Sequence, residues 1–477
     1  MRGLDELYSL NIDWALATFD SVSRMAPGDP RGPFFGSMVH FYLYGLSLNQ
    51  KELDLFLDKS ERVIDICDGL LDQNEHDATT KFYLGGIYGY RGLAYQSNGS
   101  ILKAVRDGRK GYLYLEDAVR EKPDLYDAHM GFGIFRYLVA KVPKSMGYLL
   151  SLLGFGGDLE GGLQSLRLAA EKGVYTRTEA KLFLSQFLFN EGRQDTAVQY
   201  VRELSATYPT NTLFIVLFAS WENRLGNVDL AFPAALKAME LNRRNTIKYG
   251  EDLIYSTLGS IYFTKNMFDS ASAYYRRYMT MTTNDERTPN ITFLRAGEAC
   301  EIAGDRATAL EFYKRMKEPR DRFWDTRNYR RGQQLIQQSL TAADIQLIRA
   351  GNESAQKHYD KSIDLYRKAF KEAGSDVDQQ LRALYGLQQA QFDSARLDEA
   401  IETSHTLLSL TPHDETWIIP HAWYRLGLIY EKQRKISDAR GAFGHVSRYD
   451  GYEFQAHLEE QVKEELSKID AAASKGG

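Results

Sequence analysis

The chain has 477 residues, of which 43% are hydrophobic, 26% are charged and 11 are proline, and its formal net charge is −5. This composition excludes a disordered chain, and the length exceeds one ordinary core, so we expect domains or an array of repeated units. The negative charge disfavours nucleic acid as a partner, because the field of the whole chain repels phosphate.

Two further features limit the class of protein. Cys67 and Cys300 lie far apart and form no CxxC pair, which disfavours thiol redox chemistry and a cysteine-zinc site. No apolar stretch reaches the roughly 18 residues of a spanning helix, and residues 1–25 lack the order of a signal peptide. As written, the sequence predicts a soluble cytoplasmic protein. A longer gene product with a signal peptide would move the prediction to the periplasm or cell envelope.

The N-terminal third begins with half of a repeat. Ala15, Phe19, Val22 and Pro27 fit the second helix of a helix pair, so we expect that an N-terminal segment is missing from the written sequence. Glycines then recur in helical surroundings, where each costs about 1 kcal/mol against alanine. They predict close helix crossings, and the alternative is a backbone left open for a ligand. These glycines are Gly85, Gly86, Gly89, Gly92, Gly108 and Gly111.

A second glycine-rich stretch covers residues 131–163. It contains a glycine-aromatic helix, a proline and a GFGGD-x2-GGL corner, and its motif residues are Gly131, Gly133, Pro143, Gly154, Phe155, Gly157, Asp158 and Gly162. The corner lacks the Lys-Ser/Thr of a P-loop and a preceding strand, so we read these residues as mainly structural. Between them, Met146–Phe155 is the most apolar segment. It predicts a buried helix, or alternatively a surface that meets lipid or a client protein.

A repeat of helix pairs runs through the rest of the chain. Trp423-x2-Leu426-Gly427-x2-Tyr430 has a partial counterpart at Leu258-Gly259-x2-Tyr262 and another at Leu84-Gly85-x2-Tyr88. Small residues where each second helix contacts the first recur mostly every 34–40 residues, with one interval of 53, at Gly162, Ala197, Ala231, Ala271, Ala309, Ser362, Ala400 and Ala439. Left-handed corners are expected five residues earlier, at Gly157, Gly192, Gly226, Asn266 and Gly304. This pattern is typical of tetratricopeptide repeats.

The 53-residue interval includes a basic stretch at 314–331, with eight basic and three acidic residues. We expect an inserted, solvated loop there, and the alternative is a patch that docks an acidic peptide, formed by Arg320, Arg322, Arg327, Arg330 and Arg331. Residues 452–470 predict a capping helix, because an end repeat must cover the apolar face of its neighbour.

The predicted fold is therefore an all-α, right-handed superhelical solenoid of antiparallel helix pairs. We expect divergent helical repeats with a glycine-rich insert at 1–175, a tetratricopeptide array at 176–320, a second array at 321–451, and a capping helix with a tail at 452–477.

The segment from Gly131 to Leu163 resembles the tetratricopeptide family typified by the fungal inclusion-body and lipid-droplet clearance protein and its animal relatives. Bacterial proteins, often exported and of unassigned function, are more similar still. The resemblance covers roughly residues 1–240 and implies an adaptor-like role in protein or lipid homeostasis, without catalytic residues.

Catalytic motifs are absent from the sequence. The nine histidines form no HExxH pattern, and there is no G-x-S-x-G elbow and no complete G-x-G-x-x-G. We therefore predict a non-catalytic scaffold without a cofactor or metal, which binds a segment of a partner protein in a concave groove. The alternative is handling of lipid or another small hydrophobic ligand by the glycine-rich N-terminal region.

Overall fold

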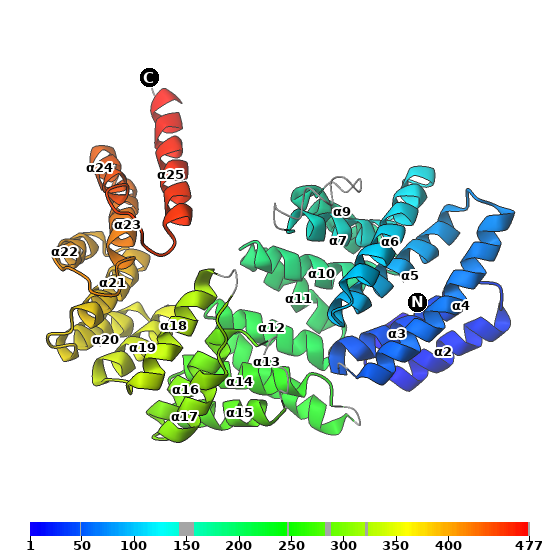
Figure 1. Cartoon of the computed structure of the whole chain (residues 1–477), viewed down its shortest axis with the longest axis horizontal. Coiled ribbons are helices and arrows are strands. Elements are labelled where there is room, and N and C mark those ends of the chain that lie inside the picture. The colour runs from blue at the N-terminus through cyan, green and yellow to red at the C-terminus, as the bar shows by residue number, and fades with distance from the viewer. Residues whose placement is uncertain (48, 143–156, 246–247, 282–287, 320–322, 476–477) are drawn as a thin grey trace. The chain divides into compact units, whose positions relative to one another are not determined.

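The computed structural model describes residues 1–47, 49–142, 157–245, 248–281, 288–319 and 323–475. Its described part consists of helices joined by short connections, without a strand, so the predicted all-α repeat class is confirmed (Figure 1). The chain divides into two compact units. Unit 1 comprises Met1–Trp221 and Pro233–Ile254, and unit 2 comprises Glu222–Phe232 and Tyr255–Gly477.

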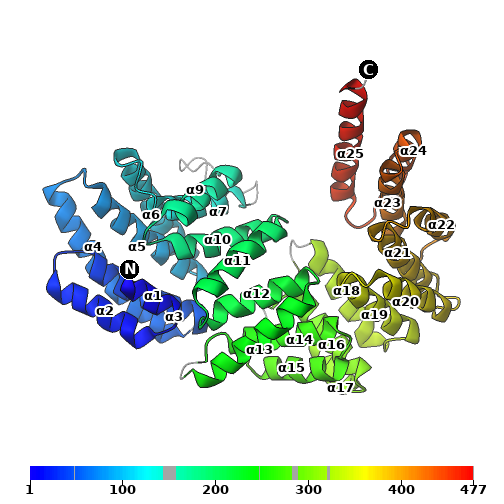
Figure 2. The same cartoon turned by 180° about the vertical axis from the view of Figure 1, so that it is seen from behind.

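Unit 1 contains the glycine-rich helices. Its pair α5 and α6 lies side by side in both views (Figure 1 and Figure 2). The helices are α1 (Arg2–Tyr8), α2 (Ile12–Met25), α3 (Arg31–Ser47), α4 (Gln50–Gln73), α5 (Ala78–Ser97), α6 (Ile101–Glu121), α7 (Ala128–Ala140), α9 (Leu159–Lys172), α10 (Arg177–Asn190) and α11 (Gln194–Thr207). Helices α12 (Thr212–Arg224), α13 (Val228–Arg244) and α14 (Glu251–Thr264) contain the boundaries between the units.

Unit 2 contains the regular repeats and the C-terminal helix. Its helices are α15 (Phe268–Met281), α16 (Asn290–Ile302), α17 (Arg306–Arg315), α18 (Phe323–Gln337), α19 (Ala342–Ala355), α20 (Tyr359–Glu372), α21 (Val377–Asp393), α22 (Leu397–Leu408), α23 (Ile418–Lys432), α24 (Ile436–Val446) and α25 (Gln455–Lys475). The finer four-part division of the chain stays a prediction.

The register of the repeats follows the small residues. Ala197, Ala271, Ala309 and Ala439 are fully buried, each on the second helix of its pair. Ser362 occupies the same place on α20 and donates a hydrogen bond to the Ala350 carbonyl oxygen on α19 at 2.9 Å. Because a small side chain at this place lets two helix backbones approach, the predicted spacing is confirmed.

The corners between paired helices are left-handed, as predicted at Gly192, Gly226, Asn266 and Gly304, where φ is between +58° and +87°. Gly157 is an exception, since it has no positive φ. Its role is steric, because a Cβ there would lie 2.6 Å from the Ala140 backbone. The later corners use Lys357, Ala395 and Arg434, which take positive φ without being glycine.

Residues 323–337 form an additional helix, α18, which packs against α16 and α17. The expectation of a solvated loop through residue 331 is therefore wrong for the residues from Phe323 onward. The unusual 53-residue interval arises because α18 stands between two regular pairs. The next helix, α19, starts at a capping box in which Thr341 and Asp344 each accept a hydrogen bond from the other's backbone.

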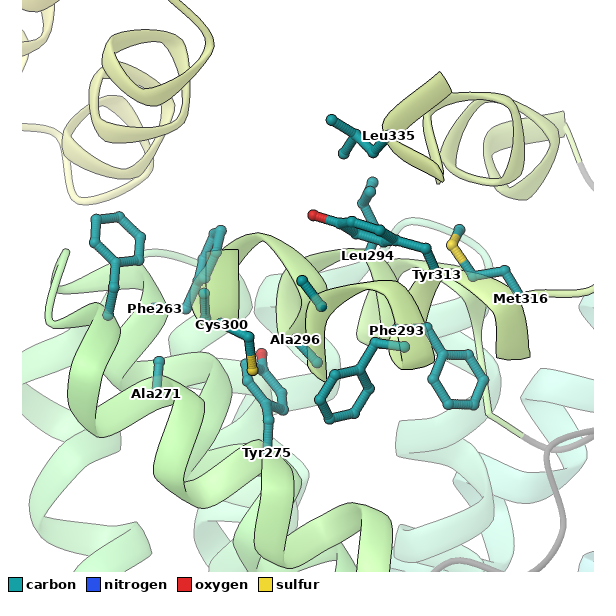
Figure 3. Close-up of a cluster of buried hydrophobic side chains, with 14 residues drawn as sticks. Phe263, Ala271, Tyr275, Phe293, Leu294, Ala296, Cys300, Tyr313, Met316 and Leu335 are labelled. Carbon is teal, nitrogen blue, oxygen red and sulfur yellow. The ribbon is translucent and has the colours of Figure 1, made fainter. Parts of the chain in front are cut away.

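One core cluster of unit 2 spans successive helices from α14 to α18 (Figure 3). Phe263, Tyr275, Phe293 and Tyr313 are all nearly inaccessible and belong to one cluster. The glycine of each first helix makes room for a ring of the second, since a Cβ on Gly259 would lie 2.8 Å from the Tyr275 ring. Gly297 faces Tyr313 and Gly427 faces Phe443 in the same way.

The C-terminal helix α25 covers the end of the array. Leu458 is fully buried and Ile469 is nearly so, while Val462 and Leu466 pack beside them against α24 and α23 residues. These contacts support the predicted capping helix. Among the described helices, none is both long and apolar enough to cross a membrane.

Candidate functional site

A charged pocket of about 350 Å³ opens in unit 2. Its walls come mainly from the first helices α16, α19, α21 and α23 and from the additional helix α18. We call it the charged pocket and define it by Glu298, Arg327, Asn328, Arg330, Arg331, Asp344, Arg382, Tyr385, Asp414, Glu415, Trp417 and Glu453, with neighbouring apolar residues.

Helix α18 brings three of the predicted patch residues to this pocket. Arg331 Nη2 lies 2.7 Å from Asp344 Oδ1, and Arg330 Nη2 lies 2.6 Å from Glu453 Oε1. The Arg327 guanidinium carbon lies 4.3 Å from the centroid of the Trp417 ring, in a cation–π contact. Arg320 and Arg322 lie outside the described residues.

Ion pairs compensate much of the positive charge of the patch. Asp344 lies between Arg331 and Arg382, whose Nη2 is 3.4 Å from the same carboxyl oxygen. The second neighbour of Arg382 is Glu415, at 3.6 Å. The pocket is therefore mixed in charge rather than a bare basic surface. A partner that is simply acidic would meet carboxylates as well as guanidinium groups.

Burial shifts the pKa values of Glu298 and Arg382 in this pocket. It raises the pKa of Glu298 to about 7, although Arg331 and Arg295 favour the charged form. It also lowers the pKa of Arg382, and the positive charge of Arg331 contributes to that shift. These shifts indicate that charges at the pocket are partly removed from water. Polar contacts with a partner are stronger in such a site than in water.

Some polar atoms of the pocket are available for further hydrogen bonds. Asp344 Oδ1, Arg382 Nε and Glu453 Oε1 are buried and make no hydrogen bond within the part of the chain that the structure describes. Each has an oppositely charged neighbour at ion-pair distance, but the geometry does not align a donor hydrogen with an acceptor. A peptide backbone carries both donors and acceptors that can occupy such positions.

A second recess, larger and mostly apolar, lies inside unit 1. It has a volume of about 540 Å³, and its walls come from α1, α3, α5, α6, α7 and the start of α10. We call it the glycine-lined cavity, because Gly85, Gly86, Gly89, Gly92, Gly108, Gly111 and Gly131 contribute to its wall. Its remaining lining is largely aromatic and aliphatic.

Glycines form a tight seam between α5 and α6. A Cβ on Gly111 would lie 2.7 Å from the Gly89 nitrogen and 2.8 Å from the Gly85 carbonyl oxygen. A Cβ on Gly92 would lie 3.1 Å from the Gly108 nitrogen. The predicted close helix crossing is confirmed. Gly89 also fits the alternative reading, because a Cβ there would meet nothing within 4 Å and the residue lines the cavity.

The motif residues that the structure describes join α7 to α9. A Cβ on Gly133 would lie 2.7 Å from the Gly162 carbonyl oxygen, so two backbones touch at this crossing. The Asp158 carboxylate accepts a hydrogen bond from Gly161 N at 2.9 Å and caps α9. Gly131 makes room for Leu115 of α6. These contacts support a structural role for the motif. Pro143, Gly154, Phe155 and the segment Met146–Phe155 lie outside the described residues.

Sequence reasoning did not identify the polar group of the cavity, which is Glu179 on α10. Tyr90 Oη donates a hydrogen bond to Glu179 Oε2 at 2.6 Å. Burial raises the pKa of Glu179, while hydrogen bonds from Tyr90 and Tyr8 oppose that shift. These residues come from α10, α5 and α1, so no local pattern in the sequence places them together.

Metal and thiol chemistry find no support among the described residues. They contain no group of three or more His, Cys, Asp or Glu side chains that is arranged to hold a metal ion. Cys67 and Cys300 are buried and free, and burial raises the pKa of both thiols.

Residues 127–285, which include the motif helices α7 and α9, match the family described as Iml2/Tetratricopeptide repeat protein 39. Over this stretch the chain is similar to the tetratricopeptide-repeat proteins of that family. The predicted family is thereby confirmed, with a matched range that starts later and ends later than the expected 1–240. Helical repeats of this type are generally non-catalytic. No curated protein matches this chain at a significant level.

Three solved structures of helical-repeat proteins are similar to this chain, all at low identity. Pseudomonas aeruginosa PilF is 15% identical, covers 53% of this chain and 98% of its own, and has a TM-score of 0.37. Yeast Tom70 is 12% identical, with coverages of 90% and 87% and a TM-score of 0.32. A human IFIT1 dimer with m7Gppp-AAAA is 16% identical, with coverages of 94% and 90% and a TM-score of 0.36. Likenesses this distant carry no information on the partner of this chain.

Proposed function

We propose that this protein is a non-catalytic scaffold that holds a polar peptide segment of a partner protein in the charged pocket of unit 2. The observation that carries the proposal is the pocket itself, whose walls are first helices of the repeats together with the additional helix α18. First helices line the binding face of many helical-repeat proteins, because the second helices stand on the outside of the array.

The chemistry of the pocket favours a peptide that carries both charge signs or many backbone contacts. Arg327 presents its guanidinium to the pocket from the face of Trp417, and no carboxylate pairs with it within the described residues. The paired arginines could donate hydrogen bonds to the backbone carbonyl groups of an extended segment, and the Asp344 carboxylate could accept hydrogen bonds from its backbone N–H groups.

The test compares two arginine variants in capture of a partner from native cell extract. Arg327→Ala removes the guanidinium from the pocket, and we expect about tenfold weaker capture of the specific partner, on the scale of an interface hot spot. Arg367→Ala is the matched control, because Arg367 lies on the second helix α20, is 52% exposed and does not line the pocket.

Both variants are first checked for an unchanged unfolding midpoint, so that a loss of capture reports binding rather than folding. Capture that is equal for Arg327→Ala, Arg367→Ala and the wild type would refute the proposed site.

The alternative function, handling of lipid or another small hydrophobic ligand, has one observation in its favour. That observation is the glycine-lined cavity of unit 1, which is separate in sequence from the charged pocket. The two functions are compatible, since each uses its own unit.

A further inference from the structure

The glycine-lined cavity has the size and lining of a small-molecule site. Its volume of about 540 Å³ falls within the range of roughly 300–1,000 Å³ that is usual for ligand pockets. Nearly all of its walls are apolar side chains or glycine backbone. Gly89 leaves space at this wall, because a Cβ there would meet nothing within 4 Å.

One end of the cavity carries a carboxyl group within a ring of tyrosines. Tyr90 donates to Glu179 at 2.6 Å, and Tyr8 provides a second hydrogen bond to the same carboxyl group. Asn211 holds Tyr8 and Tyr42 in place, because its Nδ2 donates to the Tyr8 carbonyl oxygen at 2.7 Å and to Tyr42 Oη at 3.2 Å. Glu179 is only half-buried although protein surrounds it, since it faces the cavity.

The charge of Glu179 has no compensating cation in the described part of the chain. Lys141 also lines the cavity, but its ammonium pairs with Glu191 at 2.7 Å. Asp127, the other acid of the lining, already accepts hydrogen bonds at 2.8–2.9 Å from the backbone of Val174, Tyr175 and Thr176. Glu179 is therefore the acid that a ligand can still pair with.

Aromatic rings near this carboxyl group also favour a cation. Tyr8 and Tyr42 lie 6.3 Å apart in an edge-to-face arrangement, and Tyr90 lies 6.3 Å from Phe34. All four rings line the cavity. An ammonium group gains both from the carboxylate and from the negative faces of such rings, particularly where water is excluded.

The wall of the cavity extends to the protein surface along the first turns of α6. Ile101 is 55% exposed and Val105 is 41% exposed, and both line the cavity. Leu102 beside them is 88% exposed. Aliphatic side chains in this position provide an apolar approach for a hydrophobic molecule.

We propose that the glycine-lined cavity binds a hydrophobic amine, with its ammonium group on the Glu179 carboxylate and its apolar body between α5, α6 and α7. Burial raises the pKa of Glu179, so the empty site keeps this acid neutral more readily than an exposed glutamate. Binding of the ammonium favours the carboxylate, and the carboxyl proton leaves to the buffer.

The experiment is calorimetric titration of the purified full chain with decylamine, decanol and decanoate below their micelle concentrations. These probes share one apolar chain and differ in the head group. We expect decylamine to bind at least about tenfold more tightly than decanol, the scale of a charge-assisted hydrogen bond, and decanoate to bind least. Equal affinity for decylamine and decanol, or no binding of decylamine, would overturn the proposal.

Two variants separate the carboxyl group from the cavity. Glu179→Gln keeps the shape, so decylamine binding should weaken about tenfold or more while decanol binding stays unchanged. Gly89→Leu places a side chain where a Cβ meets nothing within 4 Å, and it should abolish binding of both probes while the protein stays folded. Unchanged binding in Gly89→Leu would place the ligand elsewhere and refute the site.

A proton measurement provides a readout that a purely structural role for Glu179 would not change. Titrations in buffers of different ionisation enthalpy should show that decylamine binding near neutral pH releases a fraction of a proton up to about one, and that Glu179→Gln abolishes this release. Release that persists in the variant would contradict the assignment. Neither variant touches the charged pocket, so both should capture the partner protein normally even where amine binding fails.

Discussion

Glycines let paired helices approach closely in both units, but they face different groups in each unit. In unit 1 some glycines of α5 and α6 face backbone atoms, so the helices touch along a seam, as Gly111 does at Gly85 and Gly89. In unit 2 the glycine of a first helix faces a ring of the second, as Gly427 does at Phe443. The apolar cavity adjoins the seam of unit 1, and the polar pocket lies between helices of unit 2.

The largest expected loss of stability comes from a side chain placed in the glycine seam between α5 and α6. Gly111→Ala would place a Cβ 2.7 Å from the Gly89 nitrogen, and backbone atoms cannot rotate away, so we expect a loss of about 3 kcal/mol in the free energy of unfolding. Chemical denaturation measures it. Gly69→Ala on α4 is the control, because a Cβ there meets nothing within 4 Å, and it should stabilise by up to about 1 kcal/mol. Equal effects at both positions would refute the seam.

The matched change in unit 2 should cost less. Gly427→Ala would press a Cβ against the Phe443 ring, and the ring can shift, so we expect a loss of about 2 kcal/mol. The same denaturation experiment applies. If Gly427→Ala proves more destabilising than Gly111→Ala, the contrast between backbone seams and ring-filled pairs is wrong.

A pH dependence should distinguish the polar interior of unit 2. The folded-state pKa of Glu298 is about 7, against an ordinary value of 4.5. Its contribution to stability is thus fully present below pH 4.5 and decreases as the pH rises to about 7. Relative to wild type, Glu298→Gln should gain about 2–3 kcal/mol in unfolding free energy over this range. Urea titrations at both ends measure the change, and a constant difference would contradict the raised pKa.

The smallest effect should come from the rim of the charged pocket. Arg330 is 55% exposed, whereas the Glu453 Oε1 atom with which it pairs is buried, so Arg330→Ala should change the free energy of unfolding by less than about 1 kcal/mol. Thermal unfolding in low and high salt tests this expectation. A loss of several times that size would show that the pair contributes substantially to the stability of the repeat array.

The regular repeats were predictable because their signals are local. Buried Ala271 and Ala439 and the left-handed Gly192 and Gly304 occur at fixed spacings along the sequence. The corners at Lys357, Ala395 and Arg434 were not predictable, since these residue types give no sign of positive φ. There the packing of the two helices imposes the conformation.

The sites were predictable only in part. The arginines of α18 were identified as a patch, but their pairing with Asp344 and Glu453 depends on how distant helices converge. The charged sequence of α18 also resembled a solvated loop, because its apolar contacts, such as that of Leu335, are sparse. Glu179 gave no signal, since its tyrosine partners come from helices far away in the sequence.

The most direct test of the scaffold function is photocrosslinking in living cells. A photoreactive phenylalanine replaces Asn328, which lines the charged pocket, or Arg367, which lies outside it on α20. We predict a discrete covalent product with a partner protein from position 328 and none from position 367. Absence of a product at 328, or the same product from both positions, would contradict the proposal that this pocket holds the partner.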